Sequence, residues 1–386
     1  MQFIEQHYSV YNKVALDSIL VSASKKGASD IILKSEHSLS FLYDDEVIID
    51  TVSKPLVDTE LNAYLNDIYI SSATAILSQS KDLDFSYSIK ISRSKTVRFR
   101  VNATVVLLNA GNKGLELIFR VLSETPPSLE DLKIETKFSK SLVSNEYKSG
   151  IVFVLGPTGS GKSTLLSAVL RHKLQNEKER FLSYEAPIEY LYSCVPKMIG
   201  TISQSEIPTH LPDFVSATRN ALRRKARVVL IGESRDQETI EGVMALSGNG
   251  HLVYSTAHTN DTCSFVKVLS SKFNESQESK KEAALSLLSQ TNCVIHQDLV
   301  PAINGGLVGV RELLPLDKQE YKNFVFNQLS YDAQFLPSLT NALKKLLADF
   351  GITKSAHAKM LFDDEKITQK VLYSILNKEQ EDGDYS

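Results

Sequence analysis

A glycine-rich loop followed by lysine and serine is the feature of this sequence with the clearest chemistry. It reads Gly156-Pro157-Thr158-Gly159-Ser160-Gly161-Lys162-Ser163, between the apolar run 151–155 and a helical segment at 164–173. Its backbone N–H groups can approach phosphates because glycine has no Cβ, and the helix N-terminus adds a favourable dipole. We expect the loop and Thr164 to bind ATP, with Lys162 on the β- and γ-phosphates and Ser163 on Mg²⁺. A chance match in a chain of this length has a probability on the order of 1%.

An acidic residue follows a second strongly apolar run. Val228-Val229-Leu230-Ile231 leads directly into Gly232-Glu233. In nucleoside triphosphatases such a strand brings a carboxylate to the Mg²⁺ ion and the attacking water. Taken alone, a hydrophobic strand followed by glutamate more often marks only a strand end. Together with the phosphate loop upstream, the pattern makes Glu233 the predicted catalytic carboxylate.

The elements that must position these residues indicate two domains, since 386 residues exceed one ordinary core. Residues 1–124 combine helical segments with short β-prone runs, which is typical of a small antiparallel α+β unit. Two adjacent prolines then interrupt regular structure, and we place a linker at 125–132. Over 133–386 apolar strands alternate with helical segments, which predicts an α/β domain with a mostly parallel sheet. From about 316 to 386 the pattern is helical.

Composition and charge limit the classes of function. The chain is 42% hydrophobic and 23% charged, which is typical of globular proteins. A net charge of −3 gives no bulk attraction for nucleic acid, so no direct nucleic-acid binding is expected. No export signal and no run of eighteen apolar residues is evident, which predicts a cytoplasmic protein with peripheral membrane contact only. Three widely spaced cysteines cannot form a four-cysteine zinc site.

Several stretches resemble a known family. GESRDQETI at 232–240 and GHLVYSTAHT at 250–259 resemble the Walker B and histidine boxes of the PilT superfamily of secretion ATPases, and SYEAPIEY at 183–190 resembles its acidic box. SQSEIP at 203–208, HLP at 210–212 and RNALRRK at 219–225 are most similar to the DotB and TraJ ATPases of type IVB secretion and conjugation systems. GASD at 27–30, DFSY at 84–87 and RFRVNA at 98–103 are similar to landmarks of the family's N-terminal domain.

The resemblance implies a RecA-like P-loop core preceded by a PAS-like domain, assembled as a homo-hexamer and recruited peripherally to inner-membrane components of a secretion or conjugation apparatus. It also implies further catalytic residues. Glu185 and Glu189 are expected near Mg²⁺ and water, and His258 near the γ-phosphate; a satisfied core histidine is the alternative for His258. Arg98, Arg100 and Arg120 are expected to contact phosphate, because guanidinium groups neutralise a transferring phosphoryl group. For each arginine, an ordinary solvated strand position is the alternative.

Some positions depart from the family's pattern, and other functions compete. Ala186 stands where the acidic box usually has aspartate, and Ala257 replaces a commoner leucine. An active ATPase is nevertheless predicted, because the chain keeps the residues expected to act on the nucleotide: Lys162, Ser163, Glu185, Glu233 and His258. Its predicted work is protein transport, or transport of a pilus or a DNA–protein complex. The alternatives are a pilus retraction ATPase, a RecA-like DNA translocase, and a switch that binds ATP without turnover.

Overall fold

The computed structural model describes residues 8–43, 46–69, 73–92, 96–108, 111–273, 276–330 and 334–383. Residues 1–7, which contributed to the expectation of no export signal, lie outside them. The chain divides into two compact units. The smaller contains 1–125 with the short segments 186–194 and 206–210, and the larger contains the remainder. The sequence boundaries 1–124, 125–132 and 133–386 stay a prediction.

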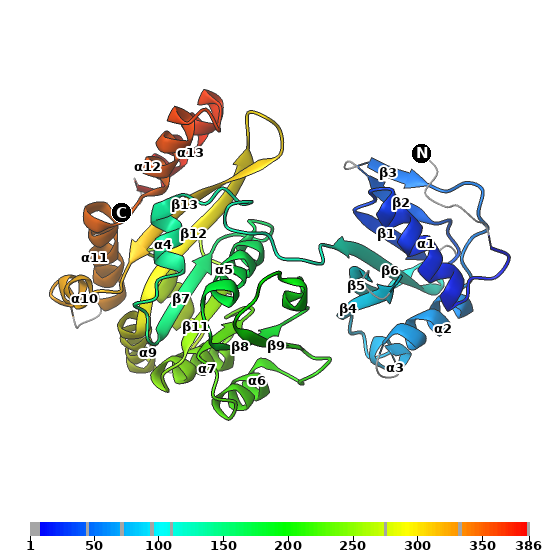
Figure 1. Cartoon of the computed structure of the whole chain (residues 1–386), viewed down its shortest axis with the longest axis horizontal. Helices are drawn as coiled ribbons and strands as arrows, with labels where there is room; N and C mark the ends of the chain where they lie inside the picture. Colours follow the sequence, from blue (N-terminus) through cyan, green and yellow to red (C-terminus); the bar gives the residue numbers. More distant parts are fainter. Residues whose placement is uncertain are drawn as a thin grey trace. The chain divides into compact units, whose positions relative to one another are not determined.

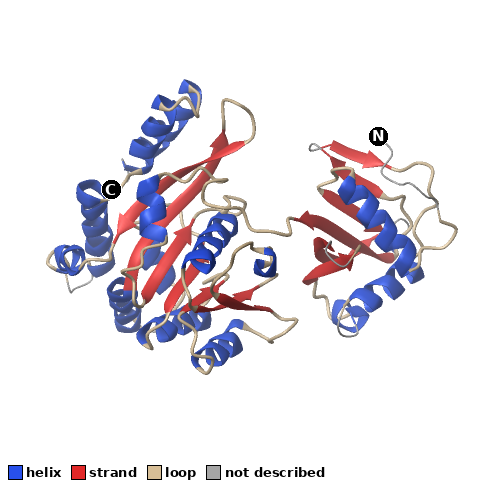
Figure 2. Ribbon diagram, viewed as in Figure 1, coloured by secondary structure: helices blue, strands red, loops and turns tan. Residues whose placement is uncertain are grey.

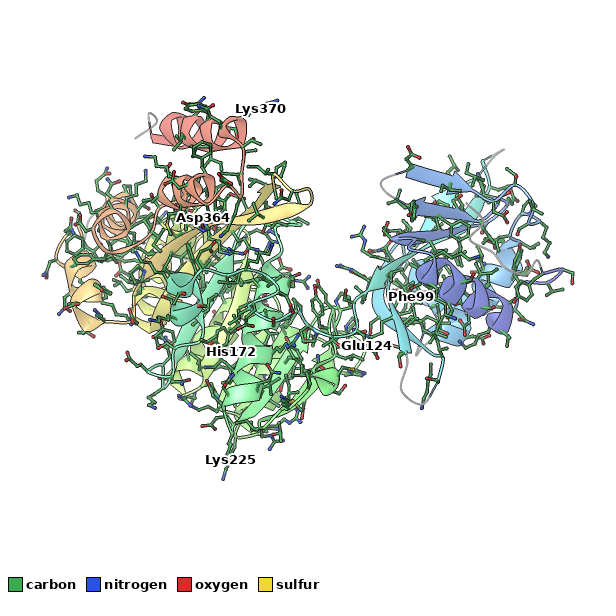
Figure 3. The ribbon with its side chains drawn as sticks, turned by 45° about the horizontal axis from the view of Figure 1, so that its top comes forward. Phe99, Glu124, His172, Lys225, Asp364 and Lys370 are labelled. Carbon is green, nitrogen blue, oxygen red and sulfur yellow. The ribbon has the colours of Figure 1, made fainter. Side chains whose placement is uncertain are left out.

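The smaller unit is an antiparallel sheet packed against helices. Its elements are α1 (Lys13–Lys25), β1 (Asp30–Lys34), β2 (Ser40–Tyr43), β3 (Glu46–Ile49), α2 (Asp58–Ile68), α3 (Ala73–Leu77), β4 (Leu83–Lys90), β5 (Thr96–Leu107) and β6 (Lys113–Leu122). The strands lie in the order β3-β2-β1-β6-β5-β4, and each described pairing is antiparallel. Phe99, labelled in Figure 3, is a fully buried residue of β5 and faces Phe119 edge to face. The predicted α+β class of this unit is confirmed.

Local signals set the first helix of this unit. Asn12 accepts a hydrogen bond from the N–H of Ala15 at 3.0 Å, which caps the helix N-terminus. Leu16, Ile19 and Leu20 recur at helical spacing and are buried in the core. Two further helices, α2 and α3, follow β3, and residues 70–72 between them lie outside the described part.

The larger unit is a seven-stranded sheet with helices packed against it (Figures 1 and 2). Its elements are α4 (Thr136–Leu142), β7 (Gly150–Leu155), α5 (Lys162–Asn176), β8 (Arg180–Glu185), β9 (Thr201–Glu206), α6 (Phe214–Leu222), β10 (Val228–Ile231), α7 (Gln237–Gly248), β11 (Leu252–Ala257), α8 (Phe265–Ser270), α9 (Gln277–Gln290), β12 (Thr291–Pro301), β13 (Leu307–Pro315), α10 (Gln319–Phe326), α11 (Phe335–Phe350), α12 (Lys354–Asp363) and α13 (Gln369–Gly383). A short 3₁₀ helix, Tyr192–Cys194, belongs to the smaller unit.

The order of strands in this sheet is β13-β12-β7-β11-β10-β8-β9. From β12 to β8 the strands run parallel, and β13 returns antiparallel to β12. Every residue of β7, β10 and β11 is buried, as expected for parallel strands covered on both faces. The predicted α/β class with a mostly parallel sheet is therefore confirmed, and the described elements after Pro315 are helices. Among the described helices, none combines the length and apolarity that a membrane crossing requires.

A partly buried ionic cluster joins the start of the larger unit to its C-terminal helices. Glu135 precedes α4, and its carboxylate lies 3.3 Å from Nη1 of Arg311, 3.2 Å from Nε2 of His357 and 3.3 Å from Nζ of Lys366. Burial alone would raise the pKa of the Glu135 carboxyl. The hydrogen bond and charge of His357 and the charge of Arg311 outweigh burial and lower the pKa to about 2.

This lowered pKa predicts how stability depends on pH. The ionised Glu135 carboxylate adds to the free energy of unfolding. This contribution is complete above the ordinary pKa of about 4.5 and is lost as pH falls toward 2. We expect Glu135→Gln to lower the free energy of unfolding by about 3 kcal/mol at pH 7 and by progressively less below pH 4. Denaturant unfolding of both proteins across this range measures the difference. The exposed Glu241, replaced by Gln, is the control and should show no such pH-dependent gap. A gap that stays constant down to pH 3 would contradict the assignment.

Candidate functional site

The predicted catalytic residues of the larger unit lie at one edge of its sheet. Ala257 pairs with Leu155, and Ile231 pairs with both Ser255 and Tyr184. The carboxyl ends of β7, β11, β10 and β8 therefore lie at the same edge, where ligands bind in open parallel sheets. The residues at these ends are Gly156, His258, Glu233 and Glu185. Strand β11 lies between β7 and β10. The glycine-rich loop and Glu233 therefore follow two strands that have one strand between them.

The glycine-rich loop has a backbone that only glycine adopts readily. Gly156, Gly159 and Gly161 have φ values of +141°, +78° and +78°. A Cβ at Gly156 would lie 2.3 Å from the carbonyl oxygen of Gln297, so a side chain there would force the loop away from β12. The loop therefore passes close to β12, and α5 begins at Lys162.

Two polar groups of the loop are suited to an anion. The Lys162 ammonium is buried and donates to the carbonyl oxygens of Gly156 at 2.8 Å and Pro157 at 2.7 Å. The Ser160 hydroxyl is also buried, and it has no hydrogen-bond partner in the described part of the chain. Ser163, in the first turn of α5, is exposed. The N-terminus of this 15-residue helix adds its dipole, so the loop can receive a phosphate group.

A carboxylate and an imidazole lie together beside the loop. Nε2 of His258 is 3.3 Å from Oε1 of Glu233, and both side chains are partly exposed, at 46% and 37%. The backbone around Glu233 is fixed to β11, because the N–H of Ser234 donates to the carbonyl of Thr256 at 2.8 Å. Thr256 in turn donates its hydroxyl to the carbonyl of Gly232 at 2.7 Å. Two accessible side chains on a rigid backbone can exchange protons with a bound water.

The two glutamates of the acidic box lie in different units. Glu185 ends β8 in the larger unit, where its buried carboxylate accepts from the Ser183 hydroxyl at 2.7 Å and from Nε2 of Gln204 at 3.3 Å. Glu189 belongs to the smaller unit. A shared site for both therefore stays a prediction.

The three arginines expected to contact phosphate are each engaged within the smaller unit. Arg98 is 2% exposed and donates to the main-chain carbonyls of Ile188 at 2.7 Å and Glu189 at 2.8 Å. Arg100 forms a bidentate pair with Asp84, and Arg120 lies 2.9 Å from Asp30. Phosphate contacts from these arginines stay a prediction. To reach a phosphate, Arg98 would first have to break its hydrogen bonds to the two carbonyls, and Arg100 its pair with Asp84.

Sequence reasoning missed several buried polar residues near these elements. Glu206 is 2% exposed, and its carboxylate accepts from the N–H groups of Ser86 at 3.1 Å and Ile188 at 3.0 Å. Gln297 and Arg311 are buried beside the glycine-rich loop. Only Arg311 carried a signal, as a charged residue within the mostly apolar strand β13, because buried polar side chains need partners.

Comparisons with known proteins agree with this geometry. A family model described as "Type II/IV secretion system protein" matches residues 5–311. The twitching motility protein of Neisseria gonorrhoeae is 35% identical over 62% of this chain and 60% of its own length. The pilus retraction ATPase PilT of Pseudomonas aeruginosa is 29% identical over 78% of this chain and 82% of its own length.

A solved structure extends the likeness over nearly the whole chain. The Legionella pneumophila ATPase DotB superimposes with a TM-score of 0.87 and 31% identity, over 97% of this chain and 98% of that one. The resemblance to PilT-type secretion ATPases noted in the sequence is thereby confirmed. The strand order, the glycine-rich loop and the matched span together lead to one assignment: the chain belongs to the type II/IV secretion system protein family.

Proposed function

We propose that the chain binds MgATP and hydrolyses it as the motor of a type IVB secretion or conjugation system. The observation that carries the proposal is the convergence, at one sheet edge, of the glycine-rich loop after β7 and the Glu233–His258 pair after β10 and β11. The likeness to the Legionella ATPase DotB over 97% of the chain supports the type IVB assignment.

The glycine-rich loop would hold the nucleotide. The N–H groups of the loop glycines and of the first residues of α5 would face the phosphates, and Lys162 would turn its ammonium from two loop carbonyls to the β- and γ-phosphates. Mg²⁺ fits the oxygen groups here, because it needs few protein ligands when phosphates and waters complete its octahedron. Ser163 would hold the ion by its hydroxyl. When bound, the ion neutralises charge on the phosphates.

The carboxylates would act on the attacking water. Glu233 would accept its proton, and His258, 3.3 Å from Glu233, would report the presence of the γ-phosphate to β11. Glu185 and Glu189 would assist near the ion and the water. Arg98, Arg100 and Arg120 would contact phosphate only in a state in which their positions and partners have changed.

At the level of the assembly, we propose a homo-hexamer that docks peripherally on inner-membrane components and moves protein or a DNA–protein complex. Pilus retraction is the second candidate function, and it is favoured by 29% identity to the retraction ATPase PilT over 78% of the chain. The genes adjacent to this one would distinguish effector secretion, conjugation and pilus retraction.

Phosphate release from MgATP by the purified full chain tests the proposed activity. We expect hydrolysis that requires Mg²⁺, and a mass in solution six times that of one chain when nucleotide is present. Addition of single- or double-stranded DNA should leave the rate unchanged. A rate that DNA raises and salt suppresses would instead support a nucleic-acid translocase. ATP binding without any phosphate release would support the alternative of a regulatory switch that binds ATP without turnover.

A further inference from the structure

Gln297 is a buried side chain of β12 that bridges the glycine-rich loop and a buried arginine. Its Nε2 donates to the carbonyl oxygen of Ser160 at 2.6 Å, and its Oε1 accepts from Nε of Arg311 at 2.8 Å. It is 3% exposed. Strand β12 pairs in parallel with β7 up to His296 opposite Leu155, so Gln297 stands where β7 passes into the loop.

The chemistry of its two partners fixes which way the Gln297 amide points. A guanidinium only donates hydrogen bonds and a main-chain carbonyl only accepts them. The amide must therefore present oxygen to Arg311 and nitrogen to Ser160. Arg311 is itself held in place. Its guanidinium Nη1 lies 3.3 Å from the Glu135 carboxylate, and its main-chain N–H donates to Nδ1 of His357 at 2.8 Å.

Holding the Ser160 carbonyl also orients the next N–H group. The carbonyl of Ser160 and the N–H of Gly161 belong to one planar trans peptide, so they point in opposite directions. With the carbonyl directed at Gln297, the Gly161 N–H points away from β12. Gly161 has a φ of +78°, and a Cβ added there would lie 3.0 Å from Nε2 of Gln297, so the loop runs directly against this side chain.

We propose that Gln297 is a positioning residue that fixes the Gly161 N–H as a donor to a nucleotide phosphate. Arg311 orders Gln297, and the cluster of Glu135, His357 and Lys366 orders Arg311. The C-terminal helices thereby reach the phosphate loop through contiguous hydrogen bonds and ion pairs. Figure 3 labels Asp364 and Lys370 in this C-terminal part, and Asp364 lies 3.2 Å from Lys366. This inference rests on the proposed binding of ATP at the loop.

Nucleotide affinity of two Gln297 variants tests the inference. Gln297→Glu keeps an acceptor for Arg311 but sets an oxygen against the Ser160 carbonyl. Gln297→Met has similar length, no donor and no added charge. We expect both to weaken MgADP and MgATP binding by about tenfold or more, by equal factors, because the Gly161 N–H that loses its fixed orientation would face a phosphate that both nucleotides share. Turnover at saturating ATP should fall much less than affinity does. Affinity is compared at a temperature where both variants are folded, because in Gln297→Met the buried Arg311 guanidinium loses an acceptor.

Gln328 provides a matched control. Its Nε2 donates to the carbonyl of Phe324 at 3.1 Å and its Oε1 accepts from Lys345 at 3.0 Å, so it bridges a carbonyl and a cation away from the loop. Gln328→Glu and Gln328→Met should leave both affinities unchanged. Gln297 variants that bind as tightly as the wild type would overturn the inference. A wild-type chain that binds neither nucleotide would instead refute the proposed function.

Discussion

Replacing Glu233 by glutamine is expected to lower ATP hydrolysis by roughly 10²- to 10⁴-fold while MgATP still binds. Glutamine has the size of glutamate but cannot take a proton from water. The backbone contacts that hold this position run through Ser234 and Thr256 and do not involve the replaced carboxylate. The glycine-rich loop, which would supply the binding energy, is also unaltered. Single-turnover phosphate release and nucleotide titration separate the two effects.

Glu238 is the matched control for this substitution. It is an exposed glutamate in the first turn of α7, five residues farther along the chain. Glu238→Gln should hydrolyse ATP at the wild-type rate. In cells, Glu233→Gln should hold ATP and block the machine, whereas a switch that works without turnover would tolerate it. Wild-type hydrolysis by Glu233→Gln would remove Glu233 from the catalytic role.

The local part of the fold could be predicted from sequence because its causes are local. The loop glycines, the strand before them and the helix after them occur within about 25 consecutive residues, and the helical segment expected at 164–173 lies within α5. The antiparallel class of the smaller unit also followed from short β-prone runs. The edge that holds Glu233 and His258 was predictable as soon as the strands were taken as parallel, since their carboxyl ends must then coincide.

The remainder depended on contacts between distant residues. Nothing in the local pattern near Arg98 indicates that its guanidinium donates to the carbonyls of Ile188 and Glu189, ninety residues away. The order of strands, with β11 between β7 and β10, is likewise set by packing of whole elements. Gln297 and Arg311 are polar residues of β12 and β13, and their partners Ser160 and Glu135 lie 137 and 176 residues earlier in the chain. Sequence reasoning detects such residues only as exceptions.

A second substitution, Lys162→Ala, is expected to fail at an earlier step, by weakening MgATP binding at least about a hundredfold. Without nucleotide, the ammonium is held by the carbonyls of Gly156 and Pro157, at 2.8 and 2.7 Å, at the mouth of the phosphate loop. A unit charge about 4 Å from a phosphate oxygen contributes about 4 kcal/mol at an effective dielectric constant of 20, and alanine supplies none of it. Equilibrium titration with a fluorescent ATP analogue measures the loss.

Lys322 supplies the comparison for this loss of charge, because its ammonium also donates to a main-chain carbonyl, that of Ser289, far along the chain from the loop. Lys322→Ala should bind ATP normally. The two active-site variants then separate two steps of one reaction: Lys162→Ala loses binding and therefore hydrolysis, while Glu233→Gln keeps binding and loses hydrolysis alone. Normal ATP affinity and turnover in Lys162→Ala would place the nucleotide elsewhere, because no other buried ammonium lies among the loop's own residues, all of which the structure describes.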